Sequence, residues 1–435
     1  MAIDVQKIRE EFPALSESAG ARVKIHLDNP AGTQVPRRVI ERMTQALIAC
    51  NANFGGHFES SIEATEISAA AHLAMADLLN AGSAREIVFG PNMTTLAFML
   101  TRSLGPGLRE GDEILVSRME HDANVTPWRL MAEERGLIVR AFDFDPAACR
   151  YDLRQLDKLL SSRTRFAAIS YASNLTGTVN DVQEFCRRVR AAGALSFVDA
   201  VHYAPHGPID VQALGCDMLA CSPYKFFGPH QGVLWAREVL LEQLRPHKLR
   251  ASSNELPGRF ETGTPSLEGQ AGTLGAIEYL EWVGQTMAQE YLPRAAAMTG
   301  RRQSVHAAMM AIADCERGLS ARLIARLESI AGVRIHGITD RKLLEHRVPT
   351  VSISTANTDP EDLDRALAGQ GICVWSGHSY AVDVVERLGL ADAGGVLRIG
   401  AVHYNTVDEI DRAVEAIGAI LTGTNANRAA PGAQV

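Results

Sequence analysis

The residue with the clearest chemical potential is Lys225, which follows a short apolar run at 217–220 and stands among aromatic residues and prolines. Most lysines are solvated on a protein surface, but Tyr224 and Phe226 beside this one would exclude water. Desolvation disfavours the ammonium form, lowers the pKa of the amine and leaves a nucleophile that can join an aldehyde as a Schiff base. The sequence therefore predicts a covalent cofactor link at Lys225.

A carboxylate, Asp199, directly follows the apolar run at 194–198, with His202 three residues further on. A carboxylate at the end of a buried strand is unfavourable unless a cation or hydrogen-bond donors meet it. Two interpretations remain open here. Asp199 is either an ordinary helix N-cap or the partner of a protonated pyridine nitrogen, which keeps a cofactor ring electron-withdrawing.

Three further apolar runs end at polar residues of different kinds. Thr94 and Thr95 open a helical pattern, where hydroxyls and free backbone N–H groups can hold a phosphate. His121 follows the next run and can stack on a flat ring, and Asn174 follows another and can hydrogen-bond a ring oxygen. Taken singly, each has an ordinary alternative, which is a helix N-cap, a solvated loop histidine or a turn-forming asparagine.

The apolar runs alternate with helical patterns between about residues 65 and 235. They lie at 86–89, 113–116, 166–169, 194–198 and 217–220. Continuous apolar strands separated by helices, such as those expected at 124–135 and 181–192, are typical of a mainly parallel sheet covered on both faces. Ligands bind such sheets at the carboxyl ends of the strands. The five groups of polar residues are therefore expected to meet at one edge, and together they carry more weight than any one alone.

A second alternation follows a long helical pattern at 266–330. Strands are expected at 348–354, 372–375 and 396–399, with a helix at 360–368, which predicts a smaller C-terminal α/β domain. The expected organisation is an N-terminal segment that packs on the small domain, a large cofactor-binding domain, the small domain and a flexible tail, at 1–20, 21–280, 281–422 and 423–435.

Composition narrows the classes of partner. The 435 residues carry a net charge of −8, which offers no basic surface for nucleic acid. No apolar run reaches the roughly 20 residues of a membrane helix, and the charged N-terminus lacks the apolar core of a signal peptide. Seven cysteines are scattered without a Cys-x-x-Cys pair, which favours reduced thiols over disulfides or a metal site. A cytoplasmic protein that binds a small molecule is expected.

Longer motifs resemble those of the class V aminotransferase family, within its cysteine-desulfurase-like branch of fold type I enzymes that use pyridoxal 5′-phosphate (PLP). The resemblance extends from His26 to Thr406. Its most specific pieces are Glu120-His121-Asp122-Ala123-Asn124, Val198-Asp199-Ala200, Ser222-Pro223-Tyr224-Lys225 and Phe260-Glu261-Thr262-Gly263-Thr264-Pro265. The implied fold is a large domain with a mainly parallel sheet between helices and a smaller C-terminal α/β domain.

The resemblance also implies roles for the cofactor-binding residues. Lys225 would carry PLP and move the Cα proton, Asp199 would pair with the pyridinium, and His121 would stack on the ring. Asn174 would hold the phenolic oxygen, with His202 nearby, where the family usually has glutamine. The phosphate ligands implied are Thr94, Thr95 and Ser222, joined across a homodimer interface by Gly263 and Thr264, which makes the active sites shared.

On the substrate side, the resemblance implies that Arg398 binds the substrate carboxylate through its bidentate fork. Without the family, Arg398 would be interpreted as a surface residue at a strand end. Further residues expected to line the substrate side are Asn29, Trp375, His378 and Tyr380. For the last three, aromatic packing beneath the small domain is an equal alternative.

One departure from the family concerns the loop that carries the catalytic cysteine in cysteine desulfurases. Tyr380 stands in place of that cysteine and Trp375 in place of the loop arginine, while Tyr224 replaces the usual histidine before the lysine. A phenol cannot accept sulfur as a persulfide, and Cys373 lies in an apolar strand pattern typical of the core. The sequence therefore predicts that persulfide-forming desulfuration is absent.

The expected function is an enzyme that removes the Cα proton of an amino acid joined to PLP. Aminotransfer or β-elimination of the C–S lyase type is favoured, because neither needs the missing cysteine. An epimerase or racemase of the same fold and an inert scaffold remain as alternatives. A nicotinamide-dependent oxidoreductase is disfavoured because Gly105-Pro106-Gly107 precedes a strand and does not open a helix.

Overall fold

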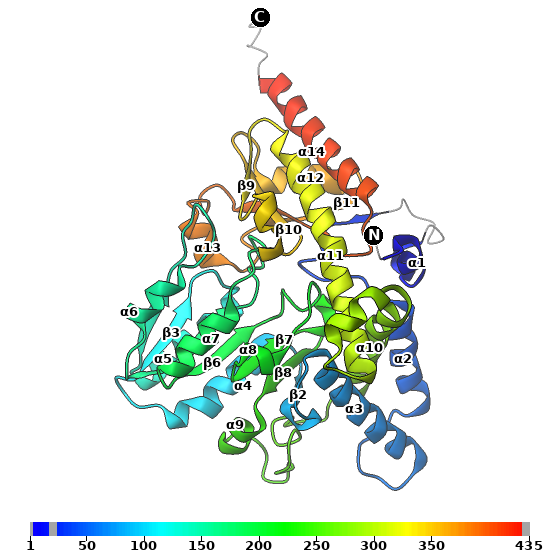
Figure 1. Cartoon of the computed structure of the whole chain (residues 1–435), viewed down its shortest axis with the longest axis vertical. Coiled ribbons are helices and arrows are strands. Elements are labelled where there is room, and N and C mark those ends of the chain that lie inside the picture. Colours follow the sequence, from blue (N-terminus) through cyan, green and yellow to red (C-terminus); the bar gives the residue numbers. More distant parts are fainter. Residues whose placement is uncertain (1–2, 17–23, 429–435) are drawn as a thin grey trace, which may run out of the picture.

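A seven-stranded sheet forms the centre of the large domain (Figure 1). The computed structural model describes residues 3–16 and 24–428. The strand order is β2-β8-β7-β6-β5-β3-β4, and all neighbours pair in parallel except β8, which is antiparallel to both β2 and β7. The bounds are β2 Ile87–Gly90, β3 Glu113–Ser117, β4 Ile138–Phe142, β5 Thr164–Ser170, β6 Leu195–Asp199, β7 Met218–Cys221 and β8 Gly232–Ala236. The expected mainly parallel sheet is confirmed.

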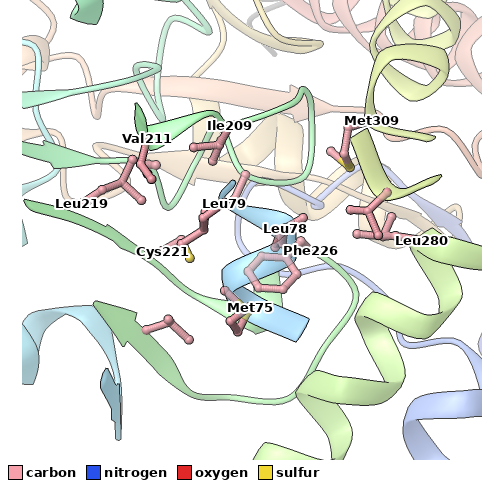
Figure 2. Packing of buried hydrophobic residues seen from close by; sticks show 14 of the residues in the cluster. Met75, Leu78, Leu79, Ile209, Val211, Leu219, Cys221, Phe226, Leu280 and Met309 are labelled. Carbon is pink, nitrogen blue, oxygen red and sulfur yellow. The ribbon is translucent and has the colours of Figure 1, made fainter. Parts of the chain in front are cut away.

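Both faces of this sheet are covered. On β3, Leu115 packs in one apolar cluster, whereas Ile114 and Val116 pack in another on the opposite face. Figure 2 shows part of the first cluster, in which Leu219 of β7 lies beside Val211 of α8, with Leu78 of α3 further along the same layer. Burial on both sides explains why the strands read as continuous apolar runs in the sequence.

Helices supply these covering layers. Those of the large domain are α2 Arg37–Ala49, α3 Glu59–Leu78, α4 Met93–Leu104, α5 Thr126–Arg135, α6 Leu156–Leu159, α7 Val182–Ala191, α8 Val211–Leu214, α9 Glu238–Gln243 and α10 Leu267–Met287. Short 3₁₀ helices lie at Pro13–Leu15, Ala84–Glu86, Gly105–Gly107, Asp122–Asn124, Leu153–Gln155, Pro223–Lys225, Gln289–Ala295 and Arg341–His346. Side chains cap the N-termini of several of these helices, among them α4 and α7. Asn92 accepts a hydrogen bond from the Thr95 N–H at 2.8 Å, and Asp181 accepts one from the Glu184 N–H at 3.1 Å.

The small domain contains a four-stranded antiparallel sheet of order β12-β13-β10-β9. Its elements are β9 Val333–His336, β10 Thr350–Thr355, α12 Pro360–Ala368, β12 Trp375–Gly377, α13 Val382–Arg387, β13 Val396–Gly400 and α14 Val407–Arg428. The long helix α11, Gly300–Glu328, runs from the large domain to the small domain beside α14 (Figure 1). Residues 423–428, expected in a flexible tail, are part of α14, and 429–435 lie outside the described residues.

The strand expected at 372–375 is divided between two sheets. Ile372–Cys373 forms β11, which pairs in parallel with β1, Ile25–His26. Trp375 begins β12 and pairs with Arg398 of β13. The N-terminal strand is therefore joined to the small domain, although it precedes the whole large domain in the sequence.

The first helix, α1 Val5–Glu10, is followed by Phe12, which packs edge-on against Tyr279 of α10. Arg9 donates a hydrogen bond to the Tyr404 carbonyl at 2.9 Å and forms an ion pair with Glu409. The N-terminal segment therefore contacts both domains. Within the described residues, none of the helices combines the length and apolar character that crossing a lipid bilayer requires.

Candidate active site

A pocket of about 310 Å³ lies at the carboxyl ends of the parallel strands. Its lining combines residues that follow β3, β5, β6 and β7 with residues of the small domain. The expected site residues that it brings together are Thr94, His121, Asn174, Asp199, His202, Ser222, Lys225, Trp375, Tyr380 and Arg398.

Other expected site residues lie elsewhere. Thr95, Gly263 and Thr264 line a separate pocket of about 790 Å³. Asn29 is buried, and its amide donates to the Gly400 carbonyl at 2.8 Å, which gives it a role in holding the backbone. His378 is also outside the lining of the first pocket, where its neighbour Ser379 takes part.

Lys225 ends a 3₁₀ turn that starts after Ser222, and this turn directs its amine into the pocket. The Nζ atom donates a hydrogen bond to the Pro30 carbonyl and lies 4.8 Å from the centre of the Tyr224 ring. Burial and, to a smaller extent, the positive charge of Arg398 lower the pKa of Lys225 to about 7, with Asp199 acting in the opposite direction. A substantial fraction of the amine is therefore neutral and nucleophilic near neutral pH.

We expect capture of the cofactor aldehyde by the PLP-free protein to increase with pH and to reach half its maximum near pH 7, because only the neutral amine reacts. Replacing Arg398 by leucine removes a positive charge, so the midpoint should move to higher pH. Stopped-flow absorbance after mixing with PLP measures both midpoints. A midpoint near that of a solvated lysine in the wild type would contradict the expected desolvation.

Asp199 ends β6 and is almost completely buried. Its Oδ1 accepts a hydrogen bond from the Val201 N–H at 2.9 Å. Burial raises the pKa of Asp199 to about 6, with Val201 and Lys225 acting in the opposite direction. A cation beside this carboxylate would remove much of the unfavourable desolvation. The protonated ring nitrogen of a pyridine is a cation of the appropriate kind.

The partly buried His121 and the buried His202 provide uncharged rings around the pocket. Burial lowers the pKa of His121 to about 4, and the charge of Lys225 contributes to that shift. The His121 ring lies parallel to the Tyr380 ring, with centroids 5.2 Å apart and an interplanar angle of 23°. Burial also lowers the pKa of His202, whose Nε2 lies 2.9 Å from the Thr350 hydroxyl. Neutral rings can stack on a cationic cofactor ring without charge repulsion.

Arg398 lies on β13 and extends from the small domain into the pocket. Its Nη1 donates to the Asn174 carbonyl at 2.9 Å, whereas its Nε has no hydrogen-bond partner among the described residues. The Asn174 side chain donates to the Ser379 carbonyl at 2.8 Å, and its Oδ1 is also buried without a partner there. These unpartnered polar atoms suit a ligand that carries both a carboxylate and a hydroxyl group.

The pocket fits PLP on the chemistry of its donors. Lys225 provides the amine for the aldehyde, and Asp199 provides the carboxylate for the ring nitrogen. Ser222 follows β7, and Thr94 lies in the first turn of α4. Their hydroxyl groups, together with the free N–H groups of that turn, can hold a phosphate. Asn174 and His121 complete the surroundings of an aromatic ring with a phenolic oxygen.

Sequence reasoning gave no role to Glu120, which is fully buried beside His121. It accepts hydrogen bonds from the Ser170 N–H at 2.9 Å and the Asn124 amide at 2.7 Å, and also from the Ser117 hydroxyl. Burial raises the pKa of Glu120 to about 7. This network fixes the loop that positions His121. Its only signal in the sequence is the charged residue directly before that histidine.

Comparisons with known proteins agree with this geometry. The family model described as Aminotransferase class-V matches residues 25–304 and 303–413. A cysteine desulfurase of Serratia proteamaculans is 30% identical over 429 residues, covering 95% of this chain and 97% of that protein. A probable cysteine desulfurase of Streptomyces coelicolor is 31% identical, with 95% and 96% covered.

Solved structures give the same result. The apo structure of a cysteine desulfurase from Thermococcus onnurineus superposes with a TM-score of 0.84 at 25% identity, covering 96% of this chain and 98% of that one. The Escherichia coli cysteine desulfurase CsdA, as its S-sulfonic acid, gives a TM-score of 0.79 at 27% identity, with 97% and 99% covered.

These relatives correct the function expected from the sequence. Aminotransfer or β-elimination without persulfide formation was favoured because Tyr380 occupies the loop position of the desulfurase cysteine. Relatives at about 30% identity over 95% of the chain are named cysteine desulfurases, so that expectation is wrong. The same finding overturns the alternatives of an epimerase and an inert scaffold.

Proposed function

The chain belongs to the class-V aminotransferase family of PLP-dependent enzymes, and from this premise we propose that it removes sulfur from L-cysteine and delivers it to a thiol as a persulfide. The observation that carries the proposal is the meeting of Lys225, Asp199 and Arg398 in one pocket. This pocket belongs to a chain whose relatives, matched over nearly their whole length, are named cysteine desulfurases.

Bound PLP supplies an electron-withdrawing ring that stabilises negative charge at the substrate Cα. Arg398 binds the substrate carboxylate and so fixes the orientation of the amino acid. Lys225, released from its covalent role, holds and moves the Cα proton, which suits an amine whose pKa burial lowers to about 7. Asp199 keeps the ring nitrogen protonated. The second reactant enters on the side of the pocket where the exposed Tyr380 lies.

The bond changes balance without an external oxidant. The acceptor thiolate attacks the substrate sulfur, a new S–S bond forms, and the C–S bond breaks with its electron pair moving to the substrate β-carbon. Protonation of that carbon gives alanine. L-cysteine and one thiol therefore become alanine and one persulfide.

The acceptor is proposed to be a diffusible thiol. All seven cysteines lie in the described residues, none of them lines the pocket, and six are buried. Tyr380 occupies the loop position from which a resident cysteine would act. The reducing cytoplasm, the proposed location, supplies such thiols and keeps the chain's own cysteines unpaired.

The test is to incubate PLP-loaded protein with L-cysteine and glutathione, alkylate the mixture, and identify products by mass spectrometry. Alanine and alkylated glutathione persulfide in equal amounts are expected. Because L-cysteine is itself a thiol, omitting glutathione should lower turnover to the rate that the substrate thiol supports as acceptor. Formation of pyruvate and ammonia in place of alanine would contradict the proposal. So would a concentration of L-cysteine that does not fall during the incubation.

A homodimer with shared active sites is part of the proposal. Helices α2 and α3 both pack on α10 and carry exposed apolar side chains on their other faces. These side chains are Ile40, Leu47 and Ile48 of α2, Ile62 and Leu73 of α3, and Phe58 at the start of α3. An apolar surface of this kind on a globular protein marks an interface. A second copy of the chain is the proposed partner.

We expect the double variant Leu47→Asp/Ile48→Asp to be monomeric in size-exclusion chromatography with light scattering, because these side chains are 53% and 77% exposed on the proposed interface. The matched control is Val239→Asp, which changes a 63% exposed apolar residue on α9. It should leave the oligomeric state unchanged. A monomeric wild type, or an unchanged dimer in the double variant, would overturn this part of the proposal.

A further inference from the structure

Three chemically distinct side chains meet where β1 pairs with β11, outside the lining of the PLP pocket. His26 and Cys373 are direct partners across the two parallel strands. Asp28 follows His26 by two residues, and the side chains at such positions lie on the same side of an extended chain. One imidazole nitrogen, one carboxylate oxygen and the thiol sulfur all lie within 4.8 Å of one another.

The spacing of these atoms suits a shared ion better than a direct hydrogen bond. His26 Nδ1 and Asp28 Oδ1 are 3.7 Å apart, which is within the range of an ion pair but too long for a hydrogen bond. Two ligands bound tetrahedrally to zinc at about 2.0–2.1 Å lie roughly 3.4 Å apart. Small side-chain rotations would therefore bring all three donors into range.

A second observation also indicates a ligand at this place. The Asp28 side chain is 28% exposed, but its Oδ1 atom is buried and, apart from the 3.7 Å ion pair with His26, has no hydrogen-bond partner among the described residues, whereas a buried carboxylate oxygen is normally satisfied. The Gln34 amide approaches the same ring nitrogen of His26 at 3.4 Å. That contact is long and therefore weak, so a cation bound between the three donors would replace only this weak hydrogen bond to His26.

We propose that His26, Asp28 and Cys373 bind one divalent cation of the zinc type, with a water molecule as the fourth ligand. A thiolate and an imidazole select a borderline-soft metal, whereas magnesium and calcium prefer sites made entirely of oxygen. One cysteine, one histidine and one carboxylate are all ligands that zinc accepts. The proposal concerns metal binding alone and does not depend on the reaction proposed for the PLP pocket.

The location gives the cation a structural effect. It joins β1, which precedes the large domain, to β11 of the small domain. Both segments continue directly into the pocket lining, since Pro30 follows Asp28 and Trp375 follows Cys373 by two residues. A bound cation would therefore hold together two borders of the PLP pocket.

The test is to titrate PLP-loaded, metal-free protein with Co²⁺ and to record the d–d bands at wavelengths longer than the cofactor absorbs. We expect one tetrahedral Co²⁺ per chain, displaced by one equivalent of Zn²⁺. Cys373→Ser and Asp28→Asn should each weaken binding at least about 100-fold, because each removes a direct ligand, and even outer-shell changes weaken binding about 10- to 100-fold.

The matched control is Cys50→Ser, because the Cys50 thiol donates to the Ala46 carbonyl at 3.6 Å and a serine hydroxyl can do the same. This variant should bind Co²⁺ like the wild type. Thermal unfolding should show that Zn²⁺ stabilises the wild type and Cys50→Ser but not Cys373→Ser. Absence of tetrahedral bands, or bands that persist in Cys373→Ser when its unfolding without metal is unchanged, would overturn the proposal.

Discussion

Replacing Lys225 by alanine is expected to lower kcat/KM for L-cysteine at least about 10⁴-fold, because general acid–base catalysis alone contributes up to about that factor. Among the described residues, Lys225 is the only lysine that lines the PLP pocket. The variant loses both the covalent attachment of the cofactor and the group that moves the proton. Borohydride reduction of the wild type should fix the cofactor on the peptide containing residue 225, and the variant should show no such label.

Lys225→Arg is the informative companion variant. It keeps a positive charge near Asp199, but its guanidinium is not a nucleophile at neutral pH. PLP should therefore bind without covalent attachment, and activity should remain as low as in Lys225→Ala. A label on another lysine, or substantial turnover in either variant, would contradict the role of Lys225.

Replacing Asp199 by asparagine is expected to reduce kcat/KM by about 100-fold or more. Removing one partner of a buried ion pair costs about 3–5 kcal/mol, and each 1.4 kcal/mol is a factor of ten. The amide has nearly the same shape as the carboxylate, so folding should be preserved. Its failure to keep the ring nitrogen protonated should appear directly as a shift in the visible spectrum of the bound cofactor.

The pH profile separates this role from a purely structural one. Burial raises the pKa of Asp199 to about 6 in the absence of PLP, so cofactor affinity in the wild type should fall as the pH drops through that value. A protonated carboxyl group cannot form an ion pair with a pyridinium. In Asp199→Asn, which has no carboxylate to protonate, the fall in cofactor affinity at acidic pH should therefore be absent. The control is Asp217→Asn, another buried carboxylate, which accepts hydrogen bonds from Ser196. This variant should have a lower free energy of unfolding, but its PLP affinity should still fall at acidic pH as in the wild type.

The residues that follow the strands could be placed from the sequence because a parallel sheet collects them at one edge. Lys225, Asp199 and Asn174 each come shortly after an apolar run, and all three line the pocket. Thr95 could not be placed in this way. One residue along α4 rotates a side chain by about 100°, and the two hydroxyls of Thr94 and Thr95 face different pockets.

Strands without an apolar run, and contacts between distant parts of the chain, could not be predicted from the sequence. The edge strand β4, Ile138–Phe142, exposes four of its five residues and therefore shows no pattern of burial. Asn29 was expected near the substrate, but its side chain serves the Gly400 carbonyl and also accepts from the Tyr404 hydroxyl. Such contacts between residues hundreds of positions apart leave no local trace in the sequence.

The pairing of β1 with β11 has a consequence for protein synthesis. Residues 25 and 26 leave the ribosome long before their partners at 372 and 373, because the whole large domain is translated between them. The large domain can form during that interval, since domains fold as units during translation. β1 therefore has no strand to pair with until β11 has been translated. Removing β1 should therefore destabilise the small domain, which contains β11, before it affects the large domain.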